Sequence, residues 1–120
     1  MTEIKNSKQY NLEDRTYLFA RKIRDFVRIA PKNLANIEYI KQLIRSSSSV
    51  GANYIEANEA LSRKDFELRI KICRKEAKES IYWLKLIETE ESLQTEQNNL
   101  INECTELMKI FGSIITKCRK

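Results

Sequence analysis

Apolar side chains recur along most of the chain at steps of three and four residues, the spacing that places them on one face of an α-helix. The first such run extends from Leu12 to Ala30 and stops there, because a residue that precedes a proline is pushed out of the helical region. A second run extends from Asn36, a predicted N-cap, to about Leu61. The first half of the chain is therefore predicted to form two amphipathic helices.

The second half of the chain contains signals for two further helices. The sequence Ser62-Arg63-Lys64-Asp65 matches a capping box, in which the serine hydroxyl and the later carboxylate satisfy free N–H groups at a helix start. It predicts a third helix that ends near Thr89. Thr95 is the predicted N-cap of a fourth helix, whose apolar residues alternate steps of four and three as in coiled-coil packing. These residues are Leu100, Cys104, Leu107, Phe111, Ile114 and Cys118.

Four helices of about 20–25 residues, each about 30–38 Å long, predict an all-α protein. Short connectors favour an antiparallel up-down-up-down four-helix bundle. We expect residues 12–120 to form this domain and residues 1–11, which lack periodicity, to form a flexible N-terminal segment. Apolar runs are far shorter than the roughly 18 residues of a membrane span, and the polar start lacks the apolar region of a signal peptide. We therefore expect a cytoplasmic protein with no membrane association.

Histidine is absent from the 120 residues, and this absence narrows the functional classes most. It excludes Ser-His-Asp and Cys-His catalysis and removes the commonest ligand of zinc and haem. Cys73, Cys104 and Cys118 form no C-x-x-C pair and lie at apolar positions of the helical patterns, so we expect structural roles for them. No nucleophile or acid–base constellation remains. We therefore expect no enzymatic activity, no cofactor and no metal site.

Two local features favour structural roles. The serine run 46–49, continued by Gly51, favours a place where two helices approach closely. The alternative, a phosphate site, requires such groups at a helix N-terminus, whereas these lie in mid-helix. Glu56 and Glu59 share one side of a helix but lack the Glu-x-x-His partner motif of a di-iron bundle. We expect them to pair with Arg63 or with a neighbouring helix.

The predicted third helix has more apolar residues than one core face needs. A second apolar set lies well around the helix from the core positions and consists of Leu68, Ile72, Trp83 and Leu86. A monomeric bundle would expose this set, and exposed patches that contain Trp and Leu usually mark an interface. The set therefore predicts self-association through the third helix. The alternative is a wide core stripe with Trp83 lying across the edge of the bundle.

Charge is segregated along the chain, although the net charge is only +5 from 22 basic and 17 acidic residues. Residues 88–106 hold six glutamates and no Lys or Arg, which leaves +11 on the remainder. On the third predicted helix, the face left free by the two apolar sets is basic and carries Lys64, Lys71, Arg74, Lys75, Lys78 and Lys85. The outer face of the first predicted helix carries Arg21, Arg24 and Arg28. Such faces suit a polyanion such as RNA or DNA, attracted by counterion release. A solvated helix face is the alternative.

Five sequence blocks make the chain recognisable. In order they are QLIR, SVGANYIEA, SRKDF, KEAKES and YWL, between residues 42 and 84. They resemble the bacterial four-helix-bundle protein family whose founding members are encoded in intervening sequences of large-subunit ribosomal RNA genes. The resemblance extends over about Asp14 to Ile87, and the fourth helix matches only in pattern. It implies an antiparallel bundle that assembles as a ring-like homopentamer. The related accessory variability protein of diversity-generating retroelements implies association with nucleic acid and a reverse transcriptase.

Two functions follow from these observations. The first is a non-enzymatic homo-oligomer, pentameric as the resemblance implies, that binds RNA or DNA through its basic helix faces with low sequence specificity. The second is a protein-interaction scaffold or accessory subunit, for example for a reverse transcriptase, whose basic side docks an acidic partner.

Overall fold

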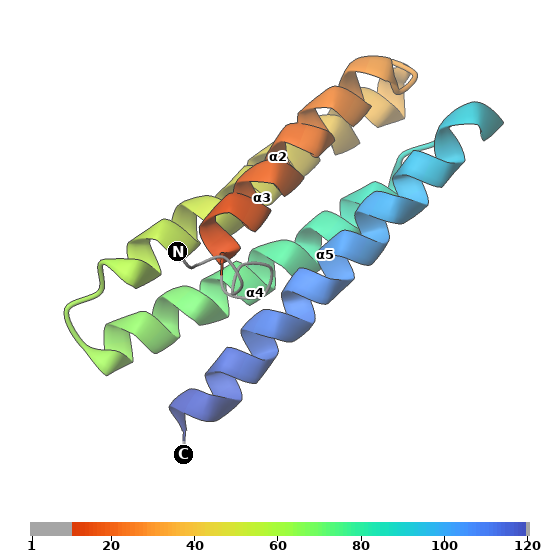
Figure 1. The fold of residues 1–120 in the computed structure, drawn as a ribbon. Coiled ribbons are helices and arrows are strands. Elements are labelled where there is room, and N and C mark those ends of the chain that lie inside the picture. Colours follow the sequence, from red (N-terminus) through yellow and green to blue (C-terminus); the bar gives the residue numbers. More distant parts are fainter. Residues whose placement is uncertain (1–10, 120) are drawn as a thin grey trace.

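Residues 11–119, the part that the computed structural model describes, form four long helices (Figure 1). These are α2 (Leu12–Ile29), α3 (Leu34–Asn58), α4 (Arg63–Leu86) and α5 (Glu91–Cys118). The prediction of a four-helix bundle is confirmed. Residues 1–10, which make up nearly all of the expected N-terminal segment, lie outside the described part, as does residue 120. Among α2 to α5, no helix is long and apolar enough to cross a membrane.

Contacts between helix ends show that consecutive helices are antiparallel. Asn58, the last residue of α3, donates a hydrogen bond of 2.8 Å to Glu13 at the start of α2. Arg63, the first residue of α4, donates to the carbonyl of Cys118 at the end of α5, at 3.1 Å. Within residues 11–119, α2 and α4 each pack against both α3 and α5 but not against each other. Thus α2 and α4 are diagonal in the bundle.

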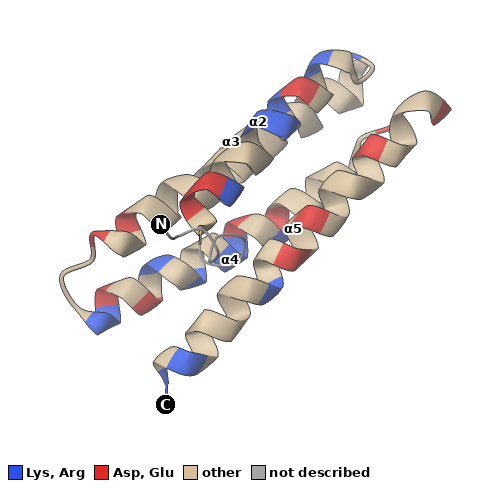
Figure 2. Cartoon of the chain, in the orientation of Figure 1, with Lys and Arg blue, Asp and Glu red and all other residues tan. Residues whose placement is uncertain are grey.

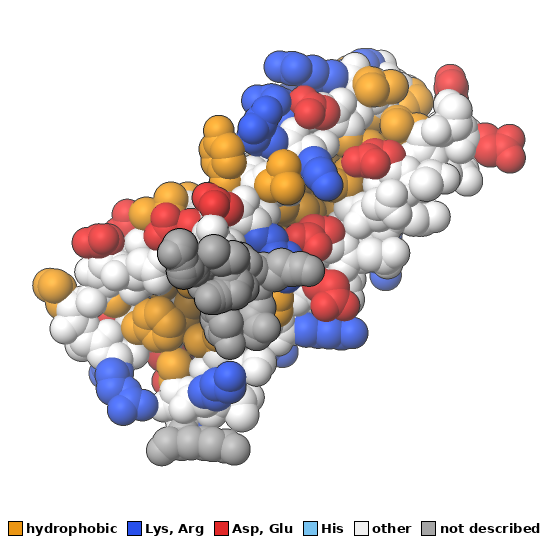
Figure 3. Space-filling view, viewed as in Figure 1, with side chains coloured by type: hydrophobic (Ala, Val, Ile, Leu, Met, Phe, Trp, Pro, Cys, Tyr) orange, Lys and Arg blue, Asp and Glu red, His pale blue; other side chains and the backbone are white. Residues whose placement is uncertain are grey.

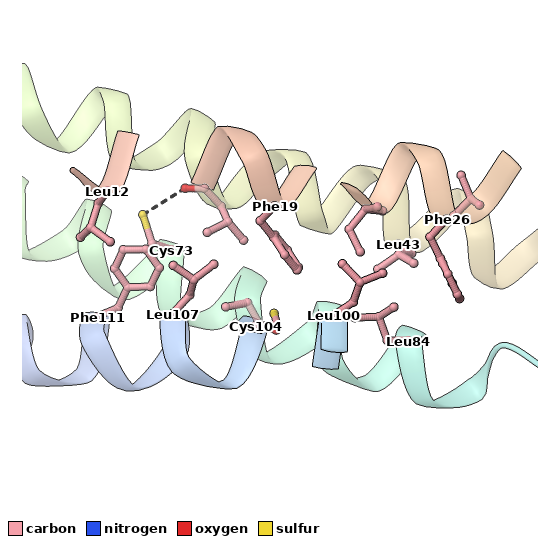
Figure 4. Close-up of a cluster of buried hydrophobic side chains, with 14 of the residues drawn as sticks. Leu12, Phe19, Phe26, Leu43, Cys73, Leu84, Leu100, Cys104, Leu107 and Phe111 are labelled. Carbon is pink, nitrogen blue, oxygen red and sulfur yellow. Dashed lines mark hydrogen bonds between the residues drawn. The ribbon is translucent and has the colours of Figure 1, made fainter. Parts of the chain in front are cut away.

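One hydrophobic core runs along the bundle (Figure 4). Phe19, Leu43, Leu84 and Phe111, one from each helix, are at most 1% exposed. Burying a side chain of this size stabilises the fold by about 1.5–3 kcal/mol. The core is therefore shared by all four helices rather than divided between two helix pairs.

Two of the three cysteines belong to this core. The thiol of Cys73 donates to the carbonyl of Val50 at 3.4 Å, and that of Cys104 donates to the carbonyl of Ala77 at 3.1 Å. Burial raises the pKa of each thiol to about 12, so both remain protonated at neutral pH. The structural role predicted for Cys73 and Cys104 is confirmed, and Cys118 is half-buried near the end of α5.

The sequence located one helix start correctly and one incorrectly. Ser62 caps α4, because its hydroxyl accepts a hydrogen bond of 3.0 Å from the backbone N–H of Asp65. The prediction that Asn36 caps α3 is wrong, because the helix begins at Leu34 and its cap is Asn33. The Asn33 side chain accepts a bond of 2.9 Å from the N–H of Asn36. Asn36 is instead buried inside the first turn, where its side chain donates hydrogen bonds to the carbonyls of Pro31 and Glu88.

The predicted start of the fourth helix at Thr95 is also wrong. Helix α5 begins at Glu91, and Glu90 occupies the cap position without a side-chain hydrogen bond. Leu93 accounts for the longer helix, because its half-buried side chain packs against the core and extends the apolar face by one turn. A hydrophobic contact thus defines this start, rather than a capping side chain.

Helices α3 and α4 each end three residues earlier than predicted, at Asn58 rather than Leu61 and at Leu86 rather than Thr89. Leu61 is 96% exposed and contributes nothing to the core. Ile87 is only 2% exposed although its backbone is extended, so an apolar residue that resembled helix periodicity is buried from the connector instead. Apolar spacing therefore overestimated the length of both helices.

The close approach predicted around the serine run is confirmed. Ser46 and Ser47 are buried, and the hydroxyl of Ser46 lies 2.8 Å from that of Ser80 on α4. On the other side of α3, a Cβ added to Gly51 would lie 2.9 Å from the Thr16 hydroxyl of α2. The small residues of α3 therefore let α2 and α4 pack closely against it.

Candidate nucleic-acid interface

Helix α4 presents a basic face to solvent along most of its length. We call this the α4 basic face; its members, all exposed, are Lys64, Lys71, Arg74, Lys75, Lys78 and Lys85. Four of these lysines recur every seven residues and therefore extend over about 30 Å of the helix. Figure 2 shows basic positions as blue segments along α4. The structure thus confirms that the predicted α4 residues share one exposed surface.

One acidic side chain, Glu67, interrupts the α4 basic face. Its carboxylate pairs with Arg119 at 3.0 Å and with Lys71 at 3.2 Å, and these hydrogen bonds hold the pKa of Glu67 below its usual value. The other five members of the face have no carboxylate within 4.0 Å among residues 11–119. Most of the positive charge on this face is therefore uncompensated in the described part of the chain.

Two glutamates of α5, Glu103 and Glu106, face α2. Glu103 forms a two-point ion pair with Arg15 of α2, at 2.8 and 3.0 Å, and lines a groove between α2 and α5 together with Glu106. Acidic and basic side chains lie next to each other along this groove (Figure 3). Toward α4, in contrast, α5 presents Gly112, at which a Cβ would lie 4.0 Å from the guanidinium of Arg74. Glu103 and Glu106 therefore lie away from the α4 basic face.

The three arginines predicted on the first helix form a separate surface. Arg21, Arg24 and Arg28 are exposed on α2, where Asp25 pairs with the latter two at 3.2 and 3.7 Å. The guanidinium of Arg21 lies 5.8 Å from the ring centre of Tyr17. Because α2 and α4 are diagonal in the bundle, their outer faces point in opposite directions. The structure therefore divides the nine predicted basic residues between two surfaces.

The second apolar set of α4 is only partly accounted for within one chain. Trp83 is half-buried and stacks on Tyr39 of α3, with ring centres 6.1 Å apart, so it lies across the edge of the bundle. Ile72 and Leu86 are half-buried, and Leu68 remains 56% exposed. The bundle thus leaves part of this set in contact with solvent.

A cluster of ion pairs that the sequence did not reveal lies beside this apolar set. Arg45 of α3 contacts the carboxylates of Glu76 at 3.4 Å and Glu79 at 2.9 Å, both on α4. Glu76 is only 7% exposed, so a carboxylate on α4 is neutralised from α3 rather than by the lysines of its own helix. The partners are 31 and 34 residues apart in the sequence, so no local spacing signals the cluster.

The expected pairing of Glu56 and Glu59 is wrong. Both side chains are exposed, and no basic group of residues 11–119 lies within 4.0 Å of either carboxylate. Arg63, the expected partner, reaches across to the carbonyl of Cys118 instead. Within the same residues, no three Cys, Asp or Glu side chains are grouped in a way that could hold a metal ion.

These features define a small antiparallel four-helix bundle with two separate basic surfaces. A family model described as 23S rRNA-intervening sequence protein matches residues 8–113. The chain belongs to this family, as its sequence blocks indicated.

Comparison with solved structures supports the same assignment. A protein of unknown function from the S23 ribosomal protein family of Bacteroides thetaiotaomicron, solved at 1.70 Å, is 34% identical in sequence and has a TM-score of 0.71. The match covers 86% of this chain and 96% of that chain. No curated protein matches this chain.

Proposed function

We propose that this protein is a non-enzymatic, cytoplasmic nucleic-acid-binding protein whose α4 basic face contacts the phosphates of RNA or DNA with low sequence specificity. The observation that carries the proposal is the uncompensated charge of this face. Five of its six members have no carboxylate within 4.0 Å among residues 11–119, while Glu103 and Glu106 of α5 line the groove toward α2. Lysines that lack protein partners can replace the counterions of phosphates, and this release drives sequence-independent binding.

Fluorescence anisotropy with labelled RNA and DNA tests this function. We expect binding at low salt and a fall in affinity of more than about tenfold between about 50 and 200 mM salt. The double substitution Lys75→Glu with Lys78→Glu should abolish this binding. Lys41→Glu is the control, since Lys41 is an exposed lysine of α3 that pairs with Glu38 at 3.5 Å.

A second pair of variants identifies the surface. Arg24→Glu with Arg28→Glu reverses two charges on α2, on the opposite side of the bundle. If this variant loses binding while the α4 variant retains it, the wrong surface has been assigned. Absence of binding at low salt contradicts the function itself, and capture of an acidic protein by nuclease-treated sample would then favour an accessory subunit.

We also propose that copies of the chain associate, as a ring-like homopentamer, through the second apolar set of α4. Leu68 supports this, because it is 56% exposed beside the half-buried Ile72. Light scattering should give a mass several times that of one chain, and Leu68→Glu should reduce it. Leu61→Glu, at a site 96% exposed in the α3–α4 connector, serves as control. The mass of a single chain for the unmodified protein would contradict the proposal.

A further inference from the structure

An exposed aromatic side chain lies within the α4 basic face, near the C-terminal end of α4. Tyr82 is 59% exposed and follows Lys75 by seven residues and Lys78 by four, while Lys85 follows it by three. Residues three or four apart are neighbours on a helix surface, and residues seven apart lie two turns apart on the same face. Tyr82 therefore lies between Lys78 and Lys85 on this face of α4, with Lys75 two turns away.

The Tyr82 ring packs on one side against other aromatic residues. The ring centre of Tyr82 lies 5.0 Å from that of Trp83, with an angle of 74° between the planes. Trp83 in turn stacks on Tyr39 of α3. Tyr82 is thus the exposed end of an aromatic series anchored across two helices, which lowers the entropic cost of presenting its ring to a ligand.

The positive potential around the ring is not cancelled by nearby acids. Glu79, which lies between the lysines in sequence, is bound at 2.9 Å by Arg45 of α3. Lys75, Lys78 and Lys85 have no carboxylate within 4.0 Å in the described part of the chain. A phosphate chain that follows these lysines would pass directly beside the Tyr82 ring.

We propose that Tyr82 is a base-stacking residue and that the α4 basic face therefore binds single-stranded nucleic acid in preference to duplex; this rests on the function proposed above. Phosphate contacts are available on both ligands, but the faces of the bases are covered in a duplex and free in a single strand. Basic grooves with aromatic platforms are the usual means of binding single strands without sequence preference, because every base has a π-face.

Substitutions at Tyr82 test the inference against one short oligonucleotide, used alone and annealed to its complement. Tyr82→Ala should weaken binding of the single strand by about fivefold or more and leave the duplex affinity unchanged. Tyr82→Phe should retain binding, since it keeps the ring. Tyr82→Leu covers Trp83 with a similar volume but has no π-face, so it should behave like Tyr82→Ala. Tyr17→Ala is the matched control, because Tyr17 is 64% exposed on α2.

A spectroscopic signal reports the contact directly. Trp83 is the only tryptophan of the chain and touches Tyr82, so its emission should change when a single strand binds but not when the duplex binds. The stacking role would be overturned if the protein bound single strand and duplex with equal affinity and the Tyr82 substitutions changed neither affinity. If Lys75→Glu with Lys78→Glu still abolished binding, the proposed function would remain intact. No binding of either ligand at low salt would overturn both.

Discussion

Individual polar side chains hold one end of this bundle together. Asn36 is fully buried, and its amide donates to the carbonyls of Pro31 at 2.9 Å and Glu88 at 2.8 Å. Its carbonyl oxygen accepts from the N–H of Glu88 at 3.0 Å. One side chain therefore joins the α2–α3 connector to the α4–α5 connector. Asparagine suits this position because its amide is both donor and acceptor.

We expect Asn36→Ala to lower the free energy of unfolding by about 2–3 kcal/mol, because it removes three hydrogen bonds to partly buried backbone groups of the two connectors. Urea unfolding measures this change. Asn58→Ala is the control, since Asn58 is exposed and its side chain donates to Glu13. Equal losses for the two variants would show that Asn36 does not join the connectors.

The thiols provide a second prediction at this scale. Burial raises the pKa of Cys73 and Cys104 to about 12, whereas Cys118 is half-buried. A thiol reagent applied to the native protein at about pH 8 should therefore modify Cys118 first, and all three thiols after unfolding. Because the folded pKa values are raised above the ordinary 9.0, their contribution to stability is complete below pH 9.0 and is lost toward about pH 12. Rapid native modification of Cys104 would contradict this burial.

At the scale of the helices, sequence spacing predicted faces better than ends. The period of α4 correctly placed Lys71 and Lys78 on one exposed surface, because that relation depends only on helix geometry. Helix ends depend on which apolar residue the connectors bury and which polar side chain they use. Leu93 lengthened α5 and Ile87 shortened α4 for this reason. Helix ends therefore depend on packing against residues that are distant in the sequence.

The two glycines of the chain give a matched prediction about helix packing. Both lie within helices, so replacement by alanine gains up to about 1 kcal/mol of helix propensity at either site. At Gly51 the new Cβ would meet the hydroxyl of Thr16 at 2.9 Å and its Cβ at 3.2 Å, and such overpacking costs about 1–3 kcal/mol. We expect Gly51→Ala to destabilise the protein.

Gly112→Ala should instead stabilise it, because the nearest atom to the new Cβ is the guanidinium of Arg74 at 4.0 Å. Thermal unfolding of both variants measures the difference. Adding Thr16→Ala to Gly51→Ala should recover part of the loss, since it removes the hydroxyl that the new Cβ meets at 2.9 Å and leaves only the Cβ of residue 16 at 3.2 Å. Stabilisation by Gly51→Ala alone would show that α2 moves away from α3 at little cost.

At the scale of the whole molecule, the packing of the four helices determines which surface each charged side chain occupies. The order of the charged residues in the sequence does not. The segregation of glutamates into residues 88–106 was evident from the sequence, but the direction of Glu103 and Glu106 toward α2 was not. The same holds for the separation of Arg24 from Lys78, since one-dimensional spacing gives no information on which helices are diagonal. The family resemblance supplied the fold, whereas the division of the candidate site into two surfaces required the tertiary structure.

The Arg15–Glu103 pair follows from this arrangement, because it joins α2 to α5 across the least extensive of the four helix interfaces. Both side chains are about one-third exposed, and two nitrogens of Arg15 donate to the two carboxylate oxygens of Glu103. This bidentate pair should therefore be stronger than an ordinary surface pair. A double-mutant cycle with Arg15→Met and Glu103→Gln should give a coupling of about 0.5–1 kcal/mol that falls with added salt. The exposed Lys41–Glu38 pair, at 3.5 Å, should give a coupling near zero.

Hydrogen exchange shows where that coupling acts. If the pair holds α2 against α5, Arg15→Met should increase exchange at the amides of α2 while those of α4, which packs against α3 and α5 over its length, remain protected. Equal acceleration in all four helices would mean that the bundle opens only as one unit. In that case the pair contributes to global stability and does not specifically hold α2 in place.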